Sequence, residues 1–187
     1  MPKILQNPRE TILREADILL RSQGYNNFSM RELANRCEIG LGTVYNYFEN
    51  KMSLVSEIFN NTWTEILKEL EEVKNKDIAF EEKIRLIYLG LEKFLLYHKE
   101  VFFELTKNGK NIKNNKNSTD CKRYDVLEHL YLIVDEIIDF HRENKEITIN
   151  IETRKLTSFL ISNMITIVMK NKEFSIDDLI YIVTNKL

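Results

Sequence analysis

The chain has 187 residues, of which 43% are hydrophobic and 30% charged, and its formal net charge is -2. This composition excludes collagen-like, low-complexity and wholly disordered chains, and it supplies enough apolar residues for a buried core. Only five glycines and two prolines are present, so few positions suit the tight turns that join β-strands. We therefore expect an all-α protein. The near-neutral charge argues against a generic polycation but does not exclude a nucleic-acid partner.

The N-terminal residues and the apolar segments indicate the cellular compartment of the protein. Residues 1–10 contain no apolar stretch long enough for a signal peptide. The longest uncharged run, residues 156–169, is too short and too polar for a membrane span, which needs about 20 apolar residues. Cys37 and Cys121 show no metal-binding spacing. The sequence therefore predicts a cytoplasmic protein without a disulfide scaffold.

Residues 7–24 carry the signals of a first helix. Asn7 can cap the helix, Pro8 suits its first position, and Glu10 falls three residues after the cap, as in a capping box. Apolar residues then recur at helical spacing, and Gly24 supplies the end.

Two short helices should follow, separated by a tight turn. Ser29 and Glu32 have the spacing of a second capping box, and residues 41–48 predict the next helix after a turn at residues 38–40. Such a pair, packed against an earlier helix, is a helix-turn-helix. Its inward positions must be apolar to hold the outward ones rigidly, as they are at five positions: Leu33, Ala34, Ile39, Val44 and Phe48.

Beyond this motif the apolar pattern predicts six further helical segments. Asn50 opens a long helix, and the pattern pauses around residues 74–77. The later segments cover about 80–98, 101–106, 127–141, 151–171 and 175–187. No internal repeat and no alternating strand pattern occur, so we expect about nine helices in two groups.

A helix-turn-helix suits DNA because its second helix fits the major groove and its N-terminal turn meets the base edges. The outward side chains of helix 41–48 include hydroxyls and an amide that can reach phosphates and bases. These outward residues are Leu41, Thr43, Tyr45, Asn46 and Tyr47.

The run from Gly42 to Lys51, GTVYNYFENK, resembles the recognition-helix signature of the TetR family of bacterial transcriptional regulators. Residues 29–34, SMRELA, match the preceding helix of that family, and the resemblance extends from about Ile12 to Phe59. The rest of the chain resembles the family only in its length and helical layout.

The resemblance implies roles for individual residues. Thr43 matches a position that contacts DNA near the start of the recognition helix. Tyr45 and Tyr47 match positions that touch the sugar-phosphate backbone, and Lys51 matches a phosphate-binding lysine. Arg31, on the supporting helix, matches a position that can reach a base or a phosphate.

Other positions of the motif vary within the family or depart from its pattern. Leu41 and Asn46 are candidates for sequence selection, through a thymine methyl group and an adenine edge respectively, and Gly42 belongs to the same contact set. Glu38 stands where many members have a turn glycine, and Gly40 where many have a capping serine. Glycine is an adequate cap, so the turn should form.

The resemblance also implies two domains and a dimer. Residues 6–66 would form the TetR-type helix-turn-helix DNA-binding domain, with its motif at about 29–48, and residues 77–187 the ligand-binding and dimerisation domain. Helix 151–171 is apolar nearly all round and should be buried on more than one side, most economically against another subunit. We expect a homodimer that packs helices 151–171 and 175–187 as a four-helix bundle and binds a palindromic operator.

The helices between about 80 and 141 would enclose a pocket for an unknown small-molecule effector, as the resemblance implies. Binding of the effector would favour a dimer that no longer matches the groove spacing, with helix 50–74 as the lever, so the protein would be a repressor released from its operator. Aromatic residues are candidates for the pocket lining, although each alone is better suited to a hydrophobic core: Trp63, Tyr88, Phe94, Phe102, Phe103, Tyr124 and Tyr131.

Two alternatives stay open. The same DNA-binding fold could answer to a protein partner through the basic segment 107–123, although a solvated loop is the simpler interpretation of that segment. A helical enzyme or carrier could also contain the motif. No HExxH, GxSxG, Walker or dinucleotide pattern appears, so we expect no catalysis, no cofactor and no metal site.

The charge is divided unevenly along the chain. Residues 1–52 carry seven Lys and Arg against six Asp and Glu, whereas residues 53–187 carry 20 against 23. The N-terminal part is thus only slightly basic. DNA binding must depend on where Arg31 and Lys51 point, and on hydroxyl groups and helix N-termini.

Overall fold

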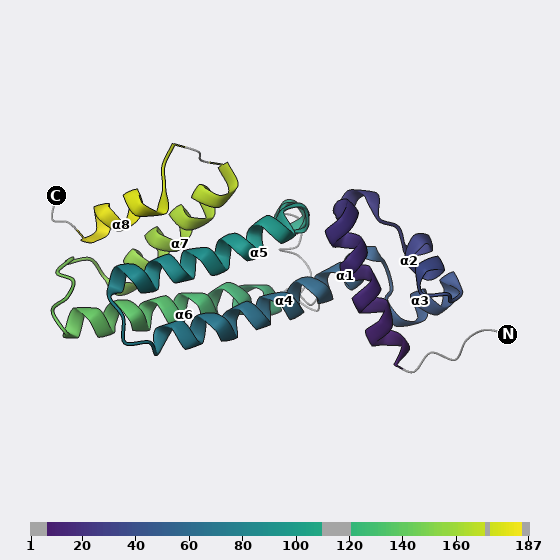
Figure 1. Cartoon of the computed structure of the whole chain (residues 1–187), viewed down its shortest axis with the longest axis horizontal. Coiled ribbons are helices and arrows are strands. Elements are labelled where there is room, and N and C mark those ends of the chain that lie inside the picture. Colours follow the sequence, from purple (N-terminus) through teal and green to yellow (C-terminus); the bar gives the residue numbers. More distant parts are fainter. Residues whose placement is uncertain (1–6, 110–120, 171–172, 185–187) are drawn as a thin grey trace. The chain divides into compact units, whose positions relative to one another are not determined.

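The computed structural model describes residues 7–109, 121–170 and 173–184, and the side chains of these except at 102–109 and 121–126. Over these residues the chain forms eight helices and no strand, which confirms the prediction of an all-α protein (Figure 1). The helices are α1 (Pro8–Asn27), α2 (Met30–Arg36), α3 (Leu41–Tyr47), α4 (Lys51–Lys74), α5 (Phe80–Gly109), α6 (Cys121–Glu143), α7 (Thr153–Lys170) and α8 (Ile176–Thr184).

The chain divides into two compact units. Unit 1 consists of Met1–Thr62 and His98–Asn108, and unit 2 of Trp63–Tyr97 and Gly109–Leu187. Helices α4 and α5 therefore supply residues to both units. Residues 98–108 belong with the N-terminal part of the chain, although the sequence assigns them to the second domain.

Two helices begin at capping side chains that the sequence indicates. The hydroxyl of Ser29 accepts a hydrogen bond from the Glu32 amide at 3.2 Å, at the start of α2. At the start of α4, the side-chain oxygen of Asn50 accepts from the Ser53 amide at 2.9 Å. Asn7 is different, because its φ of 55° is left-handed and its side chain caps no amide of α1. The expected cap at Asn7 is therefore wrong.

Two helices carry a break in their backbone. Gly24 interrupts α1 with a φ of 77°, as expected of the residue that ends the first helical stretch. His98 interrupts α5 with φ -100° and ψ 16°. The sequence predicts two separate segments on either side of this point, and the structure joins them into one bent helix.

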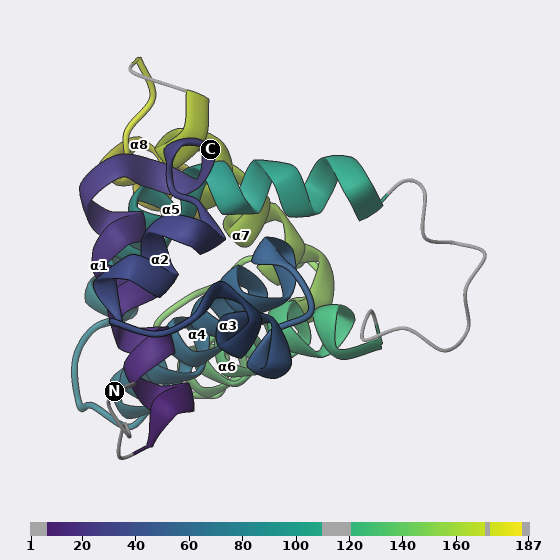
Figure 2. The same cartoon turned by 90° about the vertical axis from the view of Figure 1, so that its right-hand side faces the viewer.

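In unit 1, α1, α2 and α3 pack together (Figure 2), and a small apolar core lies between them. Ile12 and Ala16 of α1, Leu33 of α2, Val44 of α3 and Phe48 beyond it are all almost completely buried. Val44 and Phe48 are four residues apart, so they meet on one side of the third helix. This core fixes the orientation of α3 on the rest of the unit.

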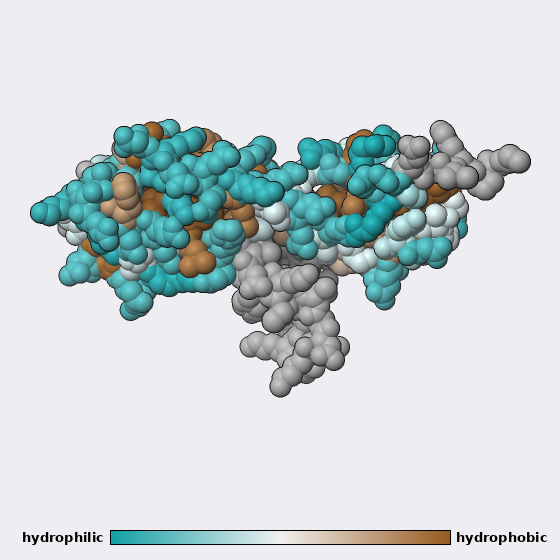
Figure 3. All heavy atoms as spheres, turned by 90° about the horizontal axis from the view of Figure 1, so that it is seen from below, coloured by the Kyte–Doolittle hydropathy of each residue, from teal (hydrophilic) through white to brown (hydrophobic). Residues whose placement is uncertain are grey.

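Unit 2 is a helical bundle in which α7 packs against both α6 and α8. Trp63 and Phe94 contact each other inside it, with ring centroids 4.7 Å apart. Arg154 of α7 binds Asp135 of α6 at 2.9 Å, and Arg85 of α5 binds Asp177 of α8. On the face shown in Figure 3, small apolar patches are separated by hydrophilic side chains.

The break in α5 places a histidine in the core of unit 1. His98 is 2% exposed, and its ring meets the ring of Phe59 edge-on at 5.1 Å. Burial lowers the pKa of His98 to about 4, although the nearby charge of Asp17 opposes that shift. The imidazole is therefore neutral in the folded protein at neutral pH.

We predict that His98 makes the fold sensitive to acid. The unfolded histidine takes up a proton near pH 6.5 and the folded one only near pH 4, so the free energy of unfolding should fall as the pH drops between these values. Between pH 7 and pH 5, the free energy of unfolding measured with urea should fall in the wild type by on the order of 1–2 kcal/mol more than it falls in His98→Gln. His129→Gln, at an exposed position, is the matched control and should behave like the wild type. Equal pH dependence in His98→Gln and the wild type would contradict the prediction.

Candidate nucleic-acid interface

The outward face of α3 carries the residues that the sequence assigns to DNA. Tyr45 and Tyr47 are 47% and 41% exposed, and Asn46 between them is also exposed. Leu41 and Thr43 are half-buried on the first turn. The structure thus places these side chains on one short helix whose opposite side is buried.

The turn before α3 is closed by backbone hydrogen bonds. The amide of Ile39 donates to the carbonyl of Ala34 at 3.0 Å, and the amide of Thr43 donates to that of Gly40 at 2.9 Å. Glu38 has a φ of 56°. This left-handed conformation explains why a glycine would suit the position, and the glutamate adopts it without opening the turn.

Charged side chains of unit 1 are largely used within the unit. Arg36 binds Glu15 at 2.7 Å, which joins α2 to α1, and this hydrogen bond lowers the pKa of Glu15. Arg9 binds Glu57 at 2.6 Å and lies over the ring of Phe48. These pairs hold the unit together and leave little charge for a partner.

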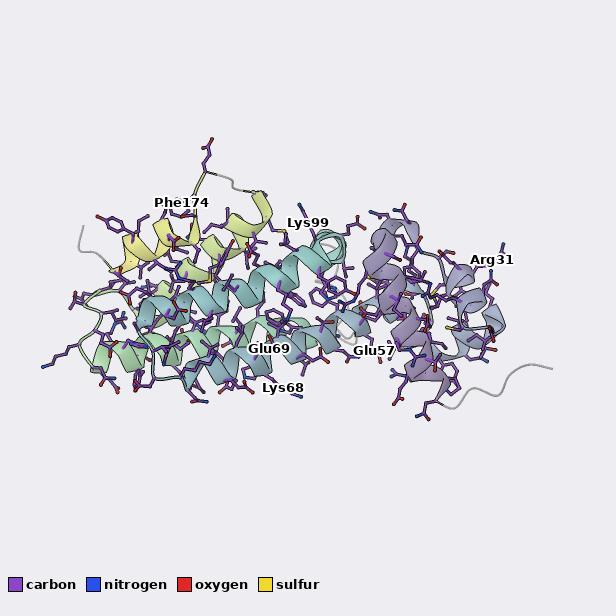
Figure 4. The ribbon with its side chains drawn as sticks, viewed as in Figure 1. Arg31, Glu57, Lys68, Glu69, Lys99 and Phe174 are labelled. Atoms are coloured by element: carbon purple, nitrogen blue, oxygen red, sulfur yellow. The ribbon has the colours of Figure 1, made fainter. Side chains whose placement is uncertain are left out.

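Arg31 is an exception. Arg9, Arg14, Arg21 and Arg36 each lie within 4 Å of a carboxylate, whereas Arg31 is exposed and makes no ion pair with the side chains that the structure describes. It projects outward from α2 (Figure 4). Its guanidinium is therefore available for a phosphate or a base.

Lys51, at the first position of α4, lies against two aromatic rings. Its Nζ is 4.4 Å from the centroid of Tyr25 and 5.1 Å from that of Phe28. Burial lowers the pKa of Lys51, and the carboxylate of Glu100 acts in the opposite direction. The sequence does not predict that Tyr25 and Phe28 contact Lys51. The one sequence feature that could have pointed to them is their position between Gly24, which breaks α1, and Ser29, which caps α2.

The aromatic candidates for an effector pocket are only partly described. Trp63, Tyr88 and Phe94 are buried in unit 2, and the hydroxyl of Tyr88 donates to Glu92 at 2.7 Å. Tyr131 is half-buried beneath the guanidinium of Arg154. The side chains of Phe102, Phe103 and Tyr124, and most of the basic segment 107–123, lie outside the described residues.

A cavity of about 470 Å³ lies elsewhere in unit 2, at the junction of α4, α5 and α6. Lys83 is 2% exposed there, donates to the carbonyl of Lys74 at 2.8 Å and lies over the ring of Phe140. None of the four aromatic candidates with described side chains lines this cavity. Its lining consists of Lys74, Asn75, Lys76, Asp77, Lys83, Glu136, Ile137 and Phe140.

The last two helices bury one side and expose another. On α8, Leu179, Ile180 and Val183 are buried, whereas Tyr181 is 62% exposed. On α7, Phe159 is 45% exposed, although it lies beside the buried Leu160. Large apolar side chains therefore remain uncovered on both helices.

Neither a metal site nor a membrane span is found in the described part of the chain. No group of three or more His, Cys, Asp or Glu side chains there could hold a metal ion. None of the helices in the same residues is long and apolar enough to cross a membrane.

Comparison with known proteins agrees with this geometry. Residues 12–58 match the family model of bacterial regulatory proteins of the tetR family, which covers α1 to α3 and the start of α4. Over these residues the chain is similar to the N-terminal region of TetR family regulators. The match includes every residue of the face described above, from Arg31 to Lys51.

Curated relatives support the assignment over longer segments. An uncharacterised HTH-type transcriptional regulator from Haemophilus influenzae is 29% identical over 126 residues, or 64% of this chain and 65% of the relative. The regulator YuxN from Bacillus subtilis is 22% identical over 146 residues, or 76% of this chain and 48% of the relative. The matched segments thus span less than two thirds of these relatives.

Solved structures share the fold over nearly the whole chain. A regulator of the TetR/AcrR family from Thermobifida fusca has a TM-score of 0.68 at 16% identity, covering 96% of this chain and 95% of that one. The regulator FadR from Bacillus subtilis, solved in complex with stearoyl-CoA, has a TM-score of 0.60 at 17% identity, covering 94% and 95%. At these identities the likeness is one of fold.

Proposed function

We propose that this protein is a TetR family regulator, a homodimeric repressor that binds a palindromic operator and is released by a small-molecule effector. The exposed face of α3 carries the DNA-binding part of the proposal. Tyr45, Asn46 and Tyr47 face outward, whereas Val44 and Phe48 hold the helix from behind. Hydroxyl and amide groups on a rigid short helix are suited to phosphates and to base edges in the major groove.

The mode of DNA binding follows from the charges. Because most arginines of unit 1 are paired with carboxylates, Arg31 and Lys51 supply the main positive charge for phosphates. We expect modest nonspecific affinity, with selectivity coming from Leu41, Thr43 and Asn46 and from the spacing of two recognition helices. In a two-fold dimer that spacing would be one DNA turn, about 34–36 Å.

Removing the contact residues of α3 and α4 should abolish DNA binding without unfolding the protein. We predict that the triple variant Thr43→Ala, Tyr47→Ala, Lys51→Ala loses affinity for a selected operator by about 100-fold or more, or about 2.7 kcal/mol. Fluorescence anisotropy measures the affinity, and circular dichroism and light scattering check the fold and the dimer. The double variant Thr148→Ala, Lys93→Ala, exposed and in unit 2, is the control and should bind normally. A wild-type protein that binds no DNA would favour the enzyme or carrier interpretation.

The dimer is supported by the exposed apolar side chains of α7 and α8. Phe159, Tyr181 and Ile182 are more than a third exposed, although each helix buries its other side. Uncovered apolar groups on two neighbouring helices are suited to a second copy of the same pair in a four-helix bundle. A two-fold interface would use each of these residues twice.

A charge on this surface should therefore separate the subunits. We predict that Phe159→Glu combined with Ile182→Glu gives a monomer in size-exclusion chromatography with light scattering, and that operator affinity falls with it. Leu132→Glu introduces the same charge at an exposed leucine of α6 and should leave the dimer intact. A double variant that stays dimeric at micromolar concentration would exclude this interface.

The effector part of the proposal is supported by the fold that the chain shares with FadR from Bacillus subtilis, a protein solved with stearoyl-CoA. Trp63 offers a local reporter, because it is the single tryptophan of the chain, is 2% exposed and contacts Phe94 inside unit 2. A ligand that binds beside this pair would change its surroundings.

Ligand binding can thus be tested together with release from DNA. Titration with stearoyl-CoA as the first probe should change Trp63 fluorescence and weaken operator binding over the same concentration range. Phe94→Leu, which removes the ring beside Trp63, should alter the fluorescence response while the operator is still bound in the absence of ligand. A fluorescence change without any effect on operator affinity would separate ligand binding from regulation and contradict release by this compound.

A further inference from the structure

The ammonium group of Lys51 is held in place rather than extended into solvent. Its Nζ lies 4.4 Å from the ring centroid of Tyr25 and 5.1 Å from that of Phe28. We propose that Tyr25 is a positioning residue, whose ring fixes the Lys51 ammonium in the place where it meets a DNA phosphate. This inference rests on the proposed DNA-binding function.

The two rings are themselves anchored. Phe28 is 1% exposed in the core of unit 1. Tyr25 follows the left-handed Gly24, and the amide of the next residue, Asn26, donates to a carboxylate oxygen of Glu100 at 3.2 Å. The backbone on both sides of Tyr25 is therefore fixed, which sets the point from which its ring reaches Lys51.

A cation is attracted to the face of an aromatic ring, and this attraction strengthens when water is removed. Burial lowers the pKa of Lys51, which means that its ammonium has lost part of its hydration. The ring faces of Tyr25 and Phe28 replace the lost water on that side, and Glu100 adds a favourable negative charge. These contacts restrict the position of the Lys51 ammonium.

The position of the ammonium matters because Lys51 begins α4. Asn50 caps this helix, and the first amides of a long helix favour an anion. A flexible lysine would lose side-chain freedom when it binds a phosphate at this helix end. The rings restrict the lysine side chain before DNA binds. Less side-chain entropy is then lost on binding, and the affinity for the phosphate is higher.

A purely structural role for Tyr25 gives a different expectation. If the ring only fills space, its loss should lower stability and leave the contribution of Lys51 to DNA binding unchanged. If the ring positions Lys51, its loss should weaken DNA binding through Lys51 alone. A double-mutant cycle separates the two cases because it measures the coupling between the side chains.

The test compares Tyr25→Leu, Tyr25→Phe, Lys51→Ala and the combination of Tyr25→Leu with Lys51→Ala. The probe is a DNA duplex that the wild-type dimer selects from a random pool, titrated at several salt concentrations. Tyr25→Phe keeps the ring and should bind within about twofold of the wild type. Tyr25→Leu should lose most of the affinity that Lys51→Ala loses, about fivefold to tenfold, and the combined variant should bind like Lys51→Ala.

Two further readouts keep the test independent of folding. The salt dependence should become shallower by about 1.8 in Lys51→Ala, because the dimer loses one phosphate contact in each subunit, and should not change further in the combined variant. In the wild type, the ε-methylene protons of Lys51 should be shifted upfield in NMR spectra by the rings, and Tyr25→Leu should reduce that shift.

Several outcomes would overturn the inference. Independent losses in the double-mutant cycle, wild-type affinity in folded Tyr25→Leu, or an unshifted Lys51 signal in the wild type would each do so. Loss of DNA binding in Tyr25→Phe would also overturn the inference, because the hydroxyl of Tyr25 and not its ring would then be needed for binding. If the wild type selects no DNA at all, the proposed DNA-binding function itself fails, which is a distinguishable result.

Discussion

The proposed DNA-binding face depends on the burial of two side chains behind a helix of seven residues. A helix as short as α3 is not stable by itself in water, since isolated helices below about 12–15 residues are marginal. Val44 and the adjoining Phe48 pack into the core formed with α1 and α2, and they replace the stability that length would give. The outward residues of α3 therefore need not stabilise the helix, and their side chains are free to be of types that contact DNA.

In unit 1, most charged side chains likewise stabilise the fold. Its charges are nearly balanced, and Arg9 and Arg36 are bound to Glu57 and Glu15. These pairs support the packing of α1 on its neighbours, while Lys51 is held by aromatic rings instead of by a carboxylate. A slightly basic head can therefore bind DNA only through a few well-placed groups, which makes their position more important than the total charge.

The sequence predicted the local features and missed those that depend on distant residues. The caps at Ser29 and Asn50, the break at Gly24 and the inward Val44 follow from residue type and spacing alone. The approach of Glu100 to Asn26 could not be predicted, because it joins residues 74 positions apart. For the same reason the ring of Tyr25 beneath Lys51 and the cavity beside Lys83 became apparent only in the structure. The assignment of α3 residues to DNA remains a prediction from the family pattern and their exposure.

The central claim is that a dimer reads DNA through the outward face of α3. Selection of duplexes from a random pool by the purified protein, followed by footprinting, tests this claim most directly. The account predicts enrichment of a palindromic sequence protected at two half-sites one helical turn apart, and loss of base preference at one symmetric position in Asn46→Ala. Absence of any enriched sequence, or a preference that Asn46→Ala and changes at Thr43 and Leu41 leave unaltered, would contradict it.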